Sequence, residues 1–389
     1  MKVLITGMGL TTSLGNTVDE MFRNLLQNKT GVKAIPEWKS FKGLFSHVAA
    51  PVHPYDISSV PRSARRTMSP MSEMAVLATT QALKEAKLEV GNHQNTPRVL
   101  LCLGSTTGSP LNMEIYFKKL FERGGPEGQM GTTFFKVMNH SVAANVAAAL
   151  EFHGPALSPS AACATSAQAM IMGWELIQSG LYDIVIAGGA DELHYTTAAV
   201  FDIVLAASRG FNERPEATPR PFDKNRDGLV VSEGASVIIM ESSESAKKRG
   251  IKGLAEFRGG AYLCDGSHMS QSSQDNMMSV MKTSLERSKV LLTEIDYVNA
   301  HATGTIQGDQ EEAQAIGSLL GSAIPVSSLK GHFGHTLATC GTLEVIASVK
   351  MIEQKIITSE ILSFFFLPCF SPLFFNLKSY VIDIGASFS

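Results

Sequence analysis

The sequence has little net charge and no region in which charge of one sign dominates. Its 33 lysine and arginine residues face 36 aspartate and glutamate residues, which gives a formal net charge of −3 at pH 7. Because no basic tail or stripe is present, the sequence predicts no nucleic-acid partner. Charged residues make up 18% of the chain and hydrophobic residues 44%, a composition typical of soluble globular proteins with a large core.

Cysteine is also scarce, and its spacing excludes two common uses. The five cysteines form no CxxC pair and are odd in number, so we expect no disulfide framework and predict a reducing, cytoplasmic location. The first residues, MKVLITGMGL, lack the long apolar region and the cleavage site of a signal peptide. We interpret them as a first β-strand.

Long hydrophobic runs are missing, with one exception near the end of the chain. Residues 361–375, ILSFFFLPCFSPLFF, contain six of the 20 phenylalanines. The run is short for a membrane span and contains two prolines, so we predict no stable membrane insertion. It is a membrane or partner contact, a buried tail or a stretch that has shifted out of the original reading frame, and we favour the last two over a contact.

Short, almost continuously apolar runs alternate with stretches of helical periodicity. The strand-like runs are KVLITG, RVLLCLGS, DIVIAGG and YVNAHA, and the helix-like stretches include SEMAVLATTQALKEAKL and SAQAMIMGWELIQSG. Strands that are apolar on both faces are typical of sheets covered by helices on both sides. The alternation therefore predicts a layered α/β fold.

The chain also contains a loose internal repeat. Residues 155–180 follow the order strand, turn of small residues, helix, and residues 323–354 follow the same order. The repeat predicts that Cys163 and His335 lie at equivalent helix starts and converge near a pseudo-twofold axis. Between the copies, residues 208–230 are rich in proline, glycine and charge, and we expect a long surface connection there.

Cys163 stands among small residues in the stretch SPSAACATSAQAM, at a predicted helix start. Unpaired amides and the positive end of the helix dipole stabilise a thiolate there, so we expect the pKa of Cys163 to fall. Its own amide is then available to an oxyanion, and the small neighbours leave room for an acyl chain. The alternative is an inert buried cysteine, which is common in cores.

Two histidines and a lysine share this setting. His301 follows a predicted strand, at the sheet edge where ligands bind in α/β folds. His335 opens a helix with an alanine and glycine face, five residues after Lys330. Each histidine alone favours a structural role, but their combination with an accessible cysteine favours catalysis.

Six motifs in one order resemble those of the thiolase-like condensing enzymes, specifically the 3-oxoacyl-[acyl-carrier-protein] synthases of the Cys-His-His type. They are ITGMG, SAACATSA, AGGADE, RPFDKNRDG, HATGTIQGD and KGHFGHTLATCG, within roughly residues 1–356. The CATSA motif favours the synthase I subtype over synthase II, without excluding the latter. The family implies a thiolase-like fold of duplicated βαβαβαββ halves in five layers, α-β-α-β-α. The nucleophile would lie in residues 1–240, and the histidines and lysine in residues 241–389.

The resemblance implies an acyltransferase of fatty acid biosynthesis that performs a decarboxylative Claisen condensation. Cys163 would accept an acyl group from a carrier thioester. His301 and His335, as neutral imidazoles, would stabilise the enolate formed when a malonyl thioester loses CO2. Lys330 would keep both imidazoles neutral, and Glu344 would pair with it, because an unpaired buried lysine is costly.

The resemblance also assigns supporting residues and partners. Thr303 and Thr305 would bond the phosphopantetheine arm, whereas Asp309 and Glu312 would organise their loop. No cofactor is implied beyond the phosphopantetheine of the carrier. Family members are homodimers, with a heterodimer as a variant, and their partner is an acidic acyl carrier protein. Local cations would dock this carrier, although each could equally belong to a solvated face: Arg62, Arg65, Arg66, Lys118, Lys119 and Arg123.

Two other kinds of site are weaker alternatives. GMGLTT lacks the third glycine of a dinucleotide-binding fingerprint. His332, His335 and Cys340 suggest zinc, but no second ligand pair with suitable spacing accompanies them, so we predict no metal. His332 also competes with His335 for the catalytic role, and the sequence TLATCG after His335 favours the latter.

The chain departs from the family near its end. The family's Gly-Phe-Gly-Gly segment, whose phenylalanine amide supplies a second oxyanion donor, is absent, and the departure begins near Thr358. We therefore expect an impaired or unstable enzyme. The alternatives are a non-catalytic, chain-length-factor-like subunit and a thiolase with a second active cysteine, for which Cys369 is a poor candidate. Acyl length, and the choice between a fatty acid and a polyene or polyketide pathway, stay open.

Overall fold

The computed structural model describes residues 1–91, 98–264, 266, 273–358, 373–374 and 381–383. Cys369 and the phenylalanine-rich run lie outside the described residues, apart from the backbone of Leu373–Phe374. The expectations about that end of the chain, including an impaired enzyme, therefore stay predictions. Within the described part, no helix is both long and apolar enough to cross a bilayer.

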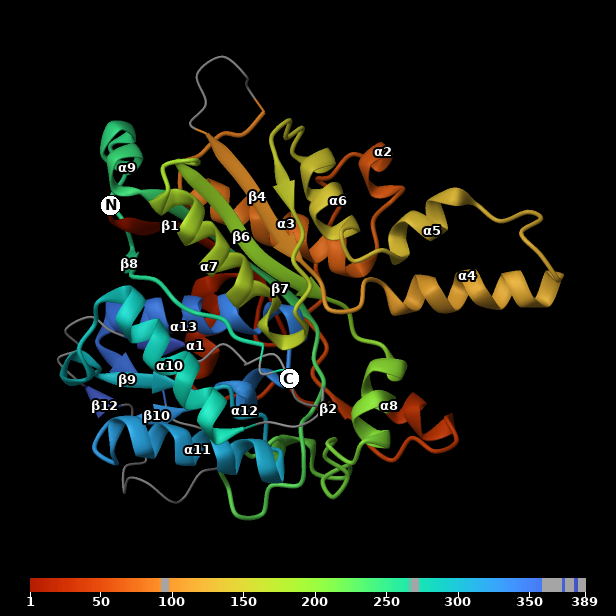
Figure 1. Cartoon of the computed structure of the whole chain (residues 1–389). Coiled ribbons are helices and arrows are strands. Elements are labelled where there is room, and N and C mark those ends of the chain that lie inside the picture. The colour runs from red at the N-terminus through yellow and green to blue at the C-terminus, as the bar shows by residue number, and fades with distance from the viewer. Residues whose placement is uncertain (92–97, 265, 267–272, 359–372, 375–380, 384–389) are drawn as a thin grey trace.

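A six-stranded mixed sheet contains most of the strands from β1 to β8 (Figure 1). Its order is β5-β4-β6-β7-β1-β8, with β4 parallel to β5 and β6, and with β7 antiparallel to both β6 and β1. The predicted strand runs in β1, β4 and β6 are confirmed. The strand bounds are β1 Val3–Thr11, β4 Val99–Gly104, β5 Ala156–Leu157, β6 Ile184–Asp191, β7 Gly234–Ser242 and β8 Ala255–Phe257.

Helices cover both faces of this sheet, as the apolar strands predict. In β4, Leu101 and Leu103 join the core beneath α3 (Pro70–Glu85) and α6 (Ser141–Ala149). The intervening residues Leu100 and Cys102 point to the opposite face and join the core of α7 (Thr165–Gln178) and α13 (Cys340–Gln354). Successive strand residues point to opposite faces, so a strand with a core on each side must be apolar throughout.

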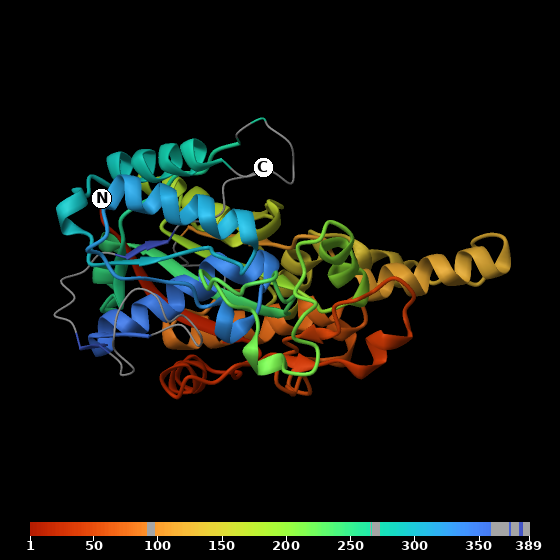
Figure 2. The same cartoon turned by 90° about the horizontal axis from the view of Figure 1, so that it is seen from below.

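A second sheet lies on the far side of α7 and α13. It has the parallel order β10-β9-β13, with bounds Val326–Ser327, Tyr297–Asn299 and Val381–Asp383. Tyr297 of β9 packs into the α7 and α13 core, whereas Val298 packs with α10 (Gln274–Ser288) and α11 (Ile306–Leu320). The layers are thus helix, sheet, helix, sheet, helix (Figures 1 and 2). This arrangement confirms the predicted five-layer thiolase-like fold.

The two central helices begin in the same way. A short 3-10 turn, η2 (Ala162–Ala164), leads into α7, and η5 (Leu337–Thr339) leads into α13. Each turn starts at a residue with positive φ, 45° at Ala162 and 52° at Leu337. The predicted repeat is therefore present in the elements, but not residue for residue: Cys163 lies inside its turn, whereas His335 lies two residues before its own.

An arm of two helices projects from the body (Figures 1 and 2). It consists of α4 (Pro110–Arg123) and α5 (Gly131–Val137), and it exposes large apolar side chains such as Phe121 and Met130, which are 76% and 65% exposed. The remaining elements are α1 Val18–Leu26, β2 Lys33–Ala34, η1 Pro36–Ser40, β3 Val48–Ala49, α2 Arg62–Arg65, α8 Tyr195–Ile203, η3 Pro215–Ala217, α9 Ser243–Arg249, η4 Leu292–Glu294, α12 Lys330–Phe333, β11 Ile356–Ile357 and β12 Leu373–Phe374.

Candidate active site

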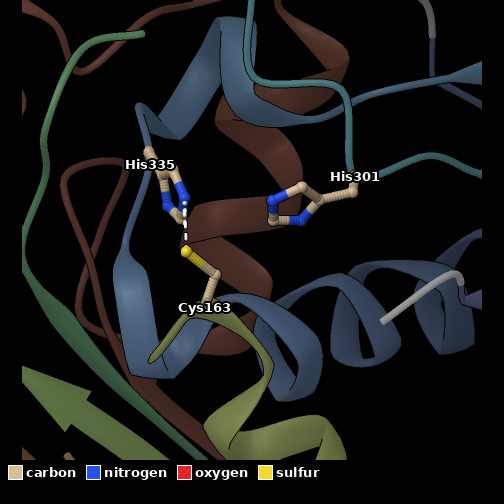
Figure 3. Close-up of side chains that lie close together, drawn as sticks. All are labelled: Cys163, His301 and His335. Carbon is tan, nitrogen blue, oxygen red and sulfur yellow. Dashed lines mark hydrogen bonds between the residues drawn. The ribbon is translucent and has the colours of Figure 1, made fainter. Parts of the chain in front are cut away.

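Cys163 and His335 are in direct contact although 172 residues separate them in the chain. The Sγ atom of Cys163 lies 3.0 Å from Nε2 of His335 (Figure 3). The hydroxyl of Thr165 holds the turn under the cysteine, because it accepts the N–H of Ala161 at 2.8 Å and donates to the carbonyl of Ala162 at 2.8 Å. The thiol is half-buried, so it is still open to a substrate.

His301 points toward the same pair from the loop after β9 (Figure 3). Its ring lies 5.4 Å from that of His335, centroid to centroid, with an angle of 83° between the planes. The sulfur and the nearest nitrogens of Cys163, His301 and His335 lie within 4.8 Å of one another. The sequence-predicted trio therefore meets at one point.

Two buried carboxylates of α11 hold the His301 loop by its backbone. Glu312 accepts the N–H groups of His301 and Ala302, each at 2.7 Å. Asp309 accepts the N–H groups of Thr303 and Gly304 at 3.0 and 3.1 Å. All of these hydrogen bonds go to backbone N–H groups of the loop and none goes to the thiol. Through them, the two carboxylates order the loop.

The segment 208–230 differs from the expected surface connection. Phe222 N–H donates to Asp309 at 2.8 Å, and the Arg226 guanidinium donates to the carbonyl of Thr305 at 2.9 Å. The Val230 carbonyl accepts the N–H of His335 at 2.7 Å. The segment is thus partly buried and supports both histidine loops, because these particular groups find their partners inside the molecule.

The protonation of His335 follows from its neighbours. Nδ1 accepts the backbone N–H of Leu337 at 3.1 Å, and a backbone N–H can only donate. The ring proton therefore sits on Nε2, the nitrogen that faces Cys163. Burial and the nearby Lys330 lower the pKa of His335 to about 3, and the same two causes, with His335, hold the pKa of His301 well below its usual value. Both imidazoles are neutral at pH 7.

Lys330 forms a buried ion pair with Glu344 of α13. The Nζ to Oε1 distance is 2.5 Å, and the two side chains are 2% and 5% exposed. Burial is the largest single effect and would lower the pKa of Lys330, but its interactions with Glu344, Cys340 and Glu312 together raise the pKa above its ordinary value. The lysine therefore stays charged beside the histidines.

The expectation of a lowered pKa for Cys163 is wrong. Burial is the largest effect and raises the pKa to about 11, while Lys330 opposes it only in part. The sulfur loses hydration beneath the two histidines, and a helix start does not compensate for that loss. The resting thiol is neutral, and the charge on Lys330 favours the thiolate only when one forms.

Family models match both parts of the chain. One, "Beta-ketoacyl synthase, N-terminal domain", covers residues 1–246, and the other, "Beta-ketoacyl synthase, C-terminal domain", covers residues 254–362. The chain belongs to the β-ketoacyl synthase family.

Known proteins resemble this β-ketoacyl synthase over most of its length. It is 35% identical over 364 residues to 3-oxoacyl-[acyl-carrier-protein] synthase 1 of Escherichia coli (strain K12), and 34% identical over 361 residues to the Haemophilus influenzae protein of the same name. Each match covers 92% of this chain and 88% of the relative.

Solved structures agree with the family. A β-ketoacyl synthase from Burkholderia phymatum STM815 superposes with a TM-score of 0.89 at 36% identity, covering 93% of this chain and 89% of that one. A ketosynthase bound to a hexaketide and in complex with its type II PKS acyl-carrier protein has a TM-score of 0.83 at 26% identity, covering 92% and 88%.

In the described part of the chain, His332, His335 and Cys340 together are not a group whose possible ligand atoms gather closely enough to hold a metal ion. The Nδ1 atom of His332 lies 2.8 Å from the carbonyl oxygen of Lys29. The trio of Cys163, His301 and His335 is compact enough for a metal, but Nε2 of His335 carries a proton and the Lys330 ammonium repels cations. The residues therefore fit an anion better than a metal ion.

Sequence reasoning missed Asp191, a buried carboxylate at the end of β6. It accepts the N–H of Ala338 at 2.8 Å and that of Thr106 at 3.0 Å, and the Thr106 hydroxyl donates to the carbonyl of Ala162 at 3.2 Å. Asp191 thereby connects the turn before α13 to the turn that holds Cys163. Its place at the carboxyl end of a predicted strand was the available signal.

The remaining predicted residues lie around or away from this centre. The hydroxyls of Thr303 and Thr305 are 3.2 Å apart, and Thr305 is the N-cap residue of α11, although its side chain makes no capping hydrogen bond. Of the predicted docking cations, most are exposed and Arg65 is half-buried; Arg62 and Arg65 form α2, Arg66 follows it, and Lys118, Lys119 and Arg123 lie on α4.

Proposed function

We propose that this synthase catalyses the decarboxylative condensation of an acyl-enzyme thioester with a malonyl thioester carried on acyl carrier protein. The observation that carries the proposal is the contact between the thiol of Cys163 and the protonated Nε2 of a neutral His335, with His301 beside them. A nucleophile and two neutral N–H donors are the groups that acyl transfer and enolate formation require.

The first step transfers the acyl group to Cys163. The sulfur attacks the carbonyl carbon of the incoming thioester, the bond to the phosphopantetheine sulfur breaks, and the thiol proton leaves with the carrier thiol. The Cys163 amide would stabilise the oxyanion, and the Lys330 ammonium, which lowers the pKa of Cys163 against the effect of burial, would stabilise the transient thiolate.

The second step forms the carbon–carbon bond. A malonyl thioester loses CO2, and the electron pair of the broken bond moves to the thioester oxygen. His301 and His335 donate hydrogen bonds to this oxygen, each worth about 3–4 kcal/mol in a site without water. The enolate carbon attacks the acyl carbonyl, the Cys163 sulfur leaves as a thiolate that takes up a proton from solvent, and a 3-oxoacyl thioester is released.

We propose the same supporting roles that the resemblance implies. Thr303 and Thr305 would bond the phosphopantetheine arm, since their hydroxyls lie on the loop that carries His301. An acidic carrier would dock on the cations of α2 and α4. The ketosynthase solved with its own acyl-carrier protein supports a partner of this class. A reducing compartment such as the cytoplasm would keep Cys163 a free thiol.

We also propose a homodimer, with the arm as part of the interface. The arm buries little of its own apolar surface, and an isolated monomer would leave it in water. Strand β5 supports the same interface, because it ends the six-stranded sheet and pairs there only with β4 in the described part of the chain. A second copy would cover both.

The proposal is tested with purified full-length protein and loaded carrier. Acyl-carrier should add one acyl group to the intact mass of the wild type and of Cys102→Ala, but not of Cys163→Ala. Malonyl-carrier should then release CO2 and 3-oxoacyl product. His301→Ala and His335→Ala should keep acylation and lose about 100- to 1,000-fold in decarboxylation.

Two results would overturn the proposal. Carrier binding without acylation or CO2 release would instead indicate a non-catalytic subunit. Cleavage of a 3-oxoacyl thioester by free coenzyme A, without malonyl decarboxylation, would instead indicate a thiolase.

A further inference from the structure

Cys340 lies on the opposite side of the His335 ring from Cys163. Its Sγ is 3.3 Å from Nδ1, the nitrogen that also accepts the Leu337 N–H. The side chain is 3% exposed and begins α13, so the helix backbone holds it in place. The reaction proposed above gives this cysteine no role.

The contact has a definite direction. Burial raises the pKa of Cys340 to about 12, although Lys330 opposes this, so the thiol keeps its proton. The Thr336 hydroxyl donates to the sulfur at 3.4 Å and therefore does not take that proton. Because Nδ1 already accepts a backbone N–H, it carries no hydrogen and can only accept. The S–H of Cys340 is the donor.

We propose that Cys340 is a positioning residue for His335: its S–H and the Leu337 N–H together hold Nδ1 as an acceptor, which keeps the ring proton on Nε2 and aims it at the Cys163 sulfur. The inference rests on the proposed function in one respect: the proposed reaction gives the Nε2–H group its role in decarboxylation. The placement of the proton itself is independent of any reaction.

Two donors at one nitrogen have a consequence that one donor lacks. A proton placed on Nδ1 would face the backbone N–H and would break the S–H bond, leaving the sulfur only as a weak acceptor, so the imidazolium and the alternative tautomer are both disfavoured. Loss of the S–H leaves only Leu337 to oppose them. His335 then becomes easier to protonate, and its ring orientation is less defined.

The test compares Cys340→Ala, Cys340→Ser and a matched control, Cys102→Ala. Cys102 is also a buried free thiol, it lies in β4, and no hydrogen bond joins it to a histidine in the described part of the chain. Serine keeps a donor at the same place, whereas alanine removes it. The first readout is the ¹⁵N spectrum of His335 in histidine-labelled protein without substrate, assigned with His335→Gln.

We expect the wild type, Cys340→Ser and Cys102→Ala to show one tautomer, with the proton on Nε2. In Cys340→Ala, the Nδ1 resonance should move toward the position of an imidazole nitrogen that accepts no hydrogen bond. The imidazole of His335 should also begin to take up a proton at a higher pH than in the wild type. Decarboxylation of malonyl-carrier should fall about five- to tenfold in this variant, while acylation of Cys163 changes less than about twofold.

An unchanged Nδ1 resonance in Cys340→Ala would overturn the inference. If the alanine variant does not fold, a serine variant whose Nδ1 resonance matches that of free imidazole would overturn it equally. A wild type that shows the Nε2 tautomer but no decarboxylation would contradict the proposed function and leave the role of Cys340 in placing the proton intact.

Discussion

At the scale of single residues, the same charge acts on the thiol and on both imidazoles. Lys330 lowers the pKa of Cys163, His301 and His335, but burial has the larger effect on each group. Burial disfavours the charged form, so it raises the pKa of the thiol and lowers that of the imidazoles. Without substrate, the thiol and both imidazoles are therefore neutral, and the charges nearby are those of the Lys330–Glu344 ion pair.

The raised pKa of Cys163 predicts how its reactivity depends on pH. Because only the thiolate is nucleophilic and the pKa is about 11, its alkylation by iodoacetamide should rise about tenfold per pH unit from about pH 7 to about pH 10. Mass spectrometry of the Cys163 peptide measures the rate. A plateau below about pH 9 would show that the thiol is instead activated.

The ion pair predicts a large loss of stability when only one partner is removed. Lys330→Met leaves the Glu344 carboxylate buried without a counter-charge, so the free energy of unfolding in urea should fall by about 3–5 kcal/mol. Adding Glu344→Gln to this variant should restore much of that loss. Equal stabilities of the single and double variants would contradict the argument.

At the scale of elements, the site depends on the contact between α7 and α13. A Cβ on Gly341 would lie 2.8 Å from the backbone nitrogen of Ala167, closer than real Cβ contacts allow. Cys163 precedes α7 and His335 precedes α13, so this close approach also sets the distance between the two reactive groups. Gly341 is the second residue of α13, and the close approach of the Ala167 backbone leaves no room for a larger residue there.

Gly341→Ala should therefore separate the two helices. We expect a destabilisation of about 1–3 kcal/mol together with slower acylation of Cys163, since the obstacle is backbone and cannot rotate away. The matched control is Gly317→Ala on α11, where an added Cβ meets open space. That variant should gain up to about 1 kcal/mol and keep its activity. Thermal melts and acylation rates compare the two, and a neutral Gly341→Ala would refute the packing argument.

At the scale of the whole molecule, the five layers bury the apolar strands on both sides, but the arm remains outside them. Its α4 and α5 pack on each other and extend away from the body (Figure 2). The exposed apolar side chains of this extension contact only one another in part and stay largely in water in a monomer, and a second copy is the partner that the proposed homodimer supplies.

Substitutions in the arm should weaken that dimer without unfolding the protomer. The double variant Phe121→Ser with Phe134→Ser removes two exposed rings, 76% and 45% exposed, so the dissociation constant measured by sedimentation should rise at least about 100-fold. Leu291→Ser, at a residue that is 67% exposed outside the arm, is the control. An arm variant that sediments like the control at every concentration would exclude the arm from the interface.

The sequence by itself determined the layered fold and the members of the site. The apolar runs of β1, β4, β6 and β9 required helices on both faces, and the motifs around Cys163, His301 and His335 identified residues that the structure brings within 4.8 Å. The strands are readable because their apolar pattern is local in the chain, whereas the members of the site are readable through the resemblance of their motifs to a known family.

Only the tertiary structure decided the chemical state of the site. The raised pKa of Cys163, the proton on Nε2 of His335, the support from residues 208–230 and the contact with Cys340 all arise from groups distant in sequence or from the loss of water around them. Desolvation and hydrogen bonding depend on which atoms surround a group in space, and neighbours along the chain do not specify those atoms.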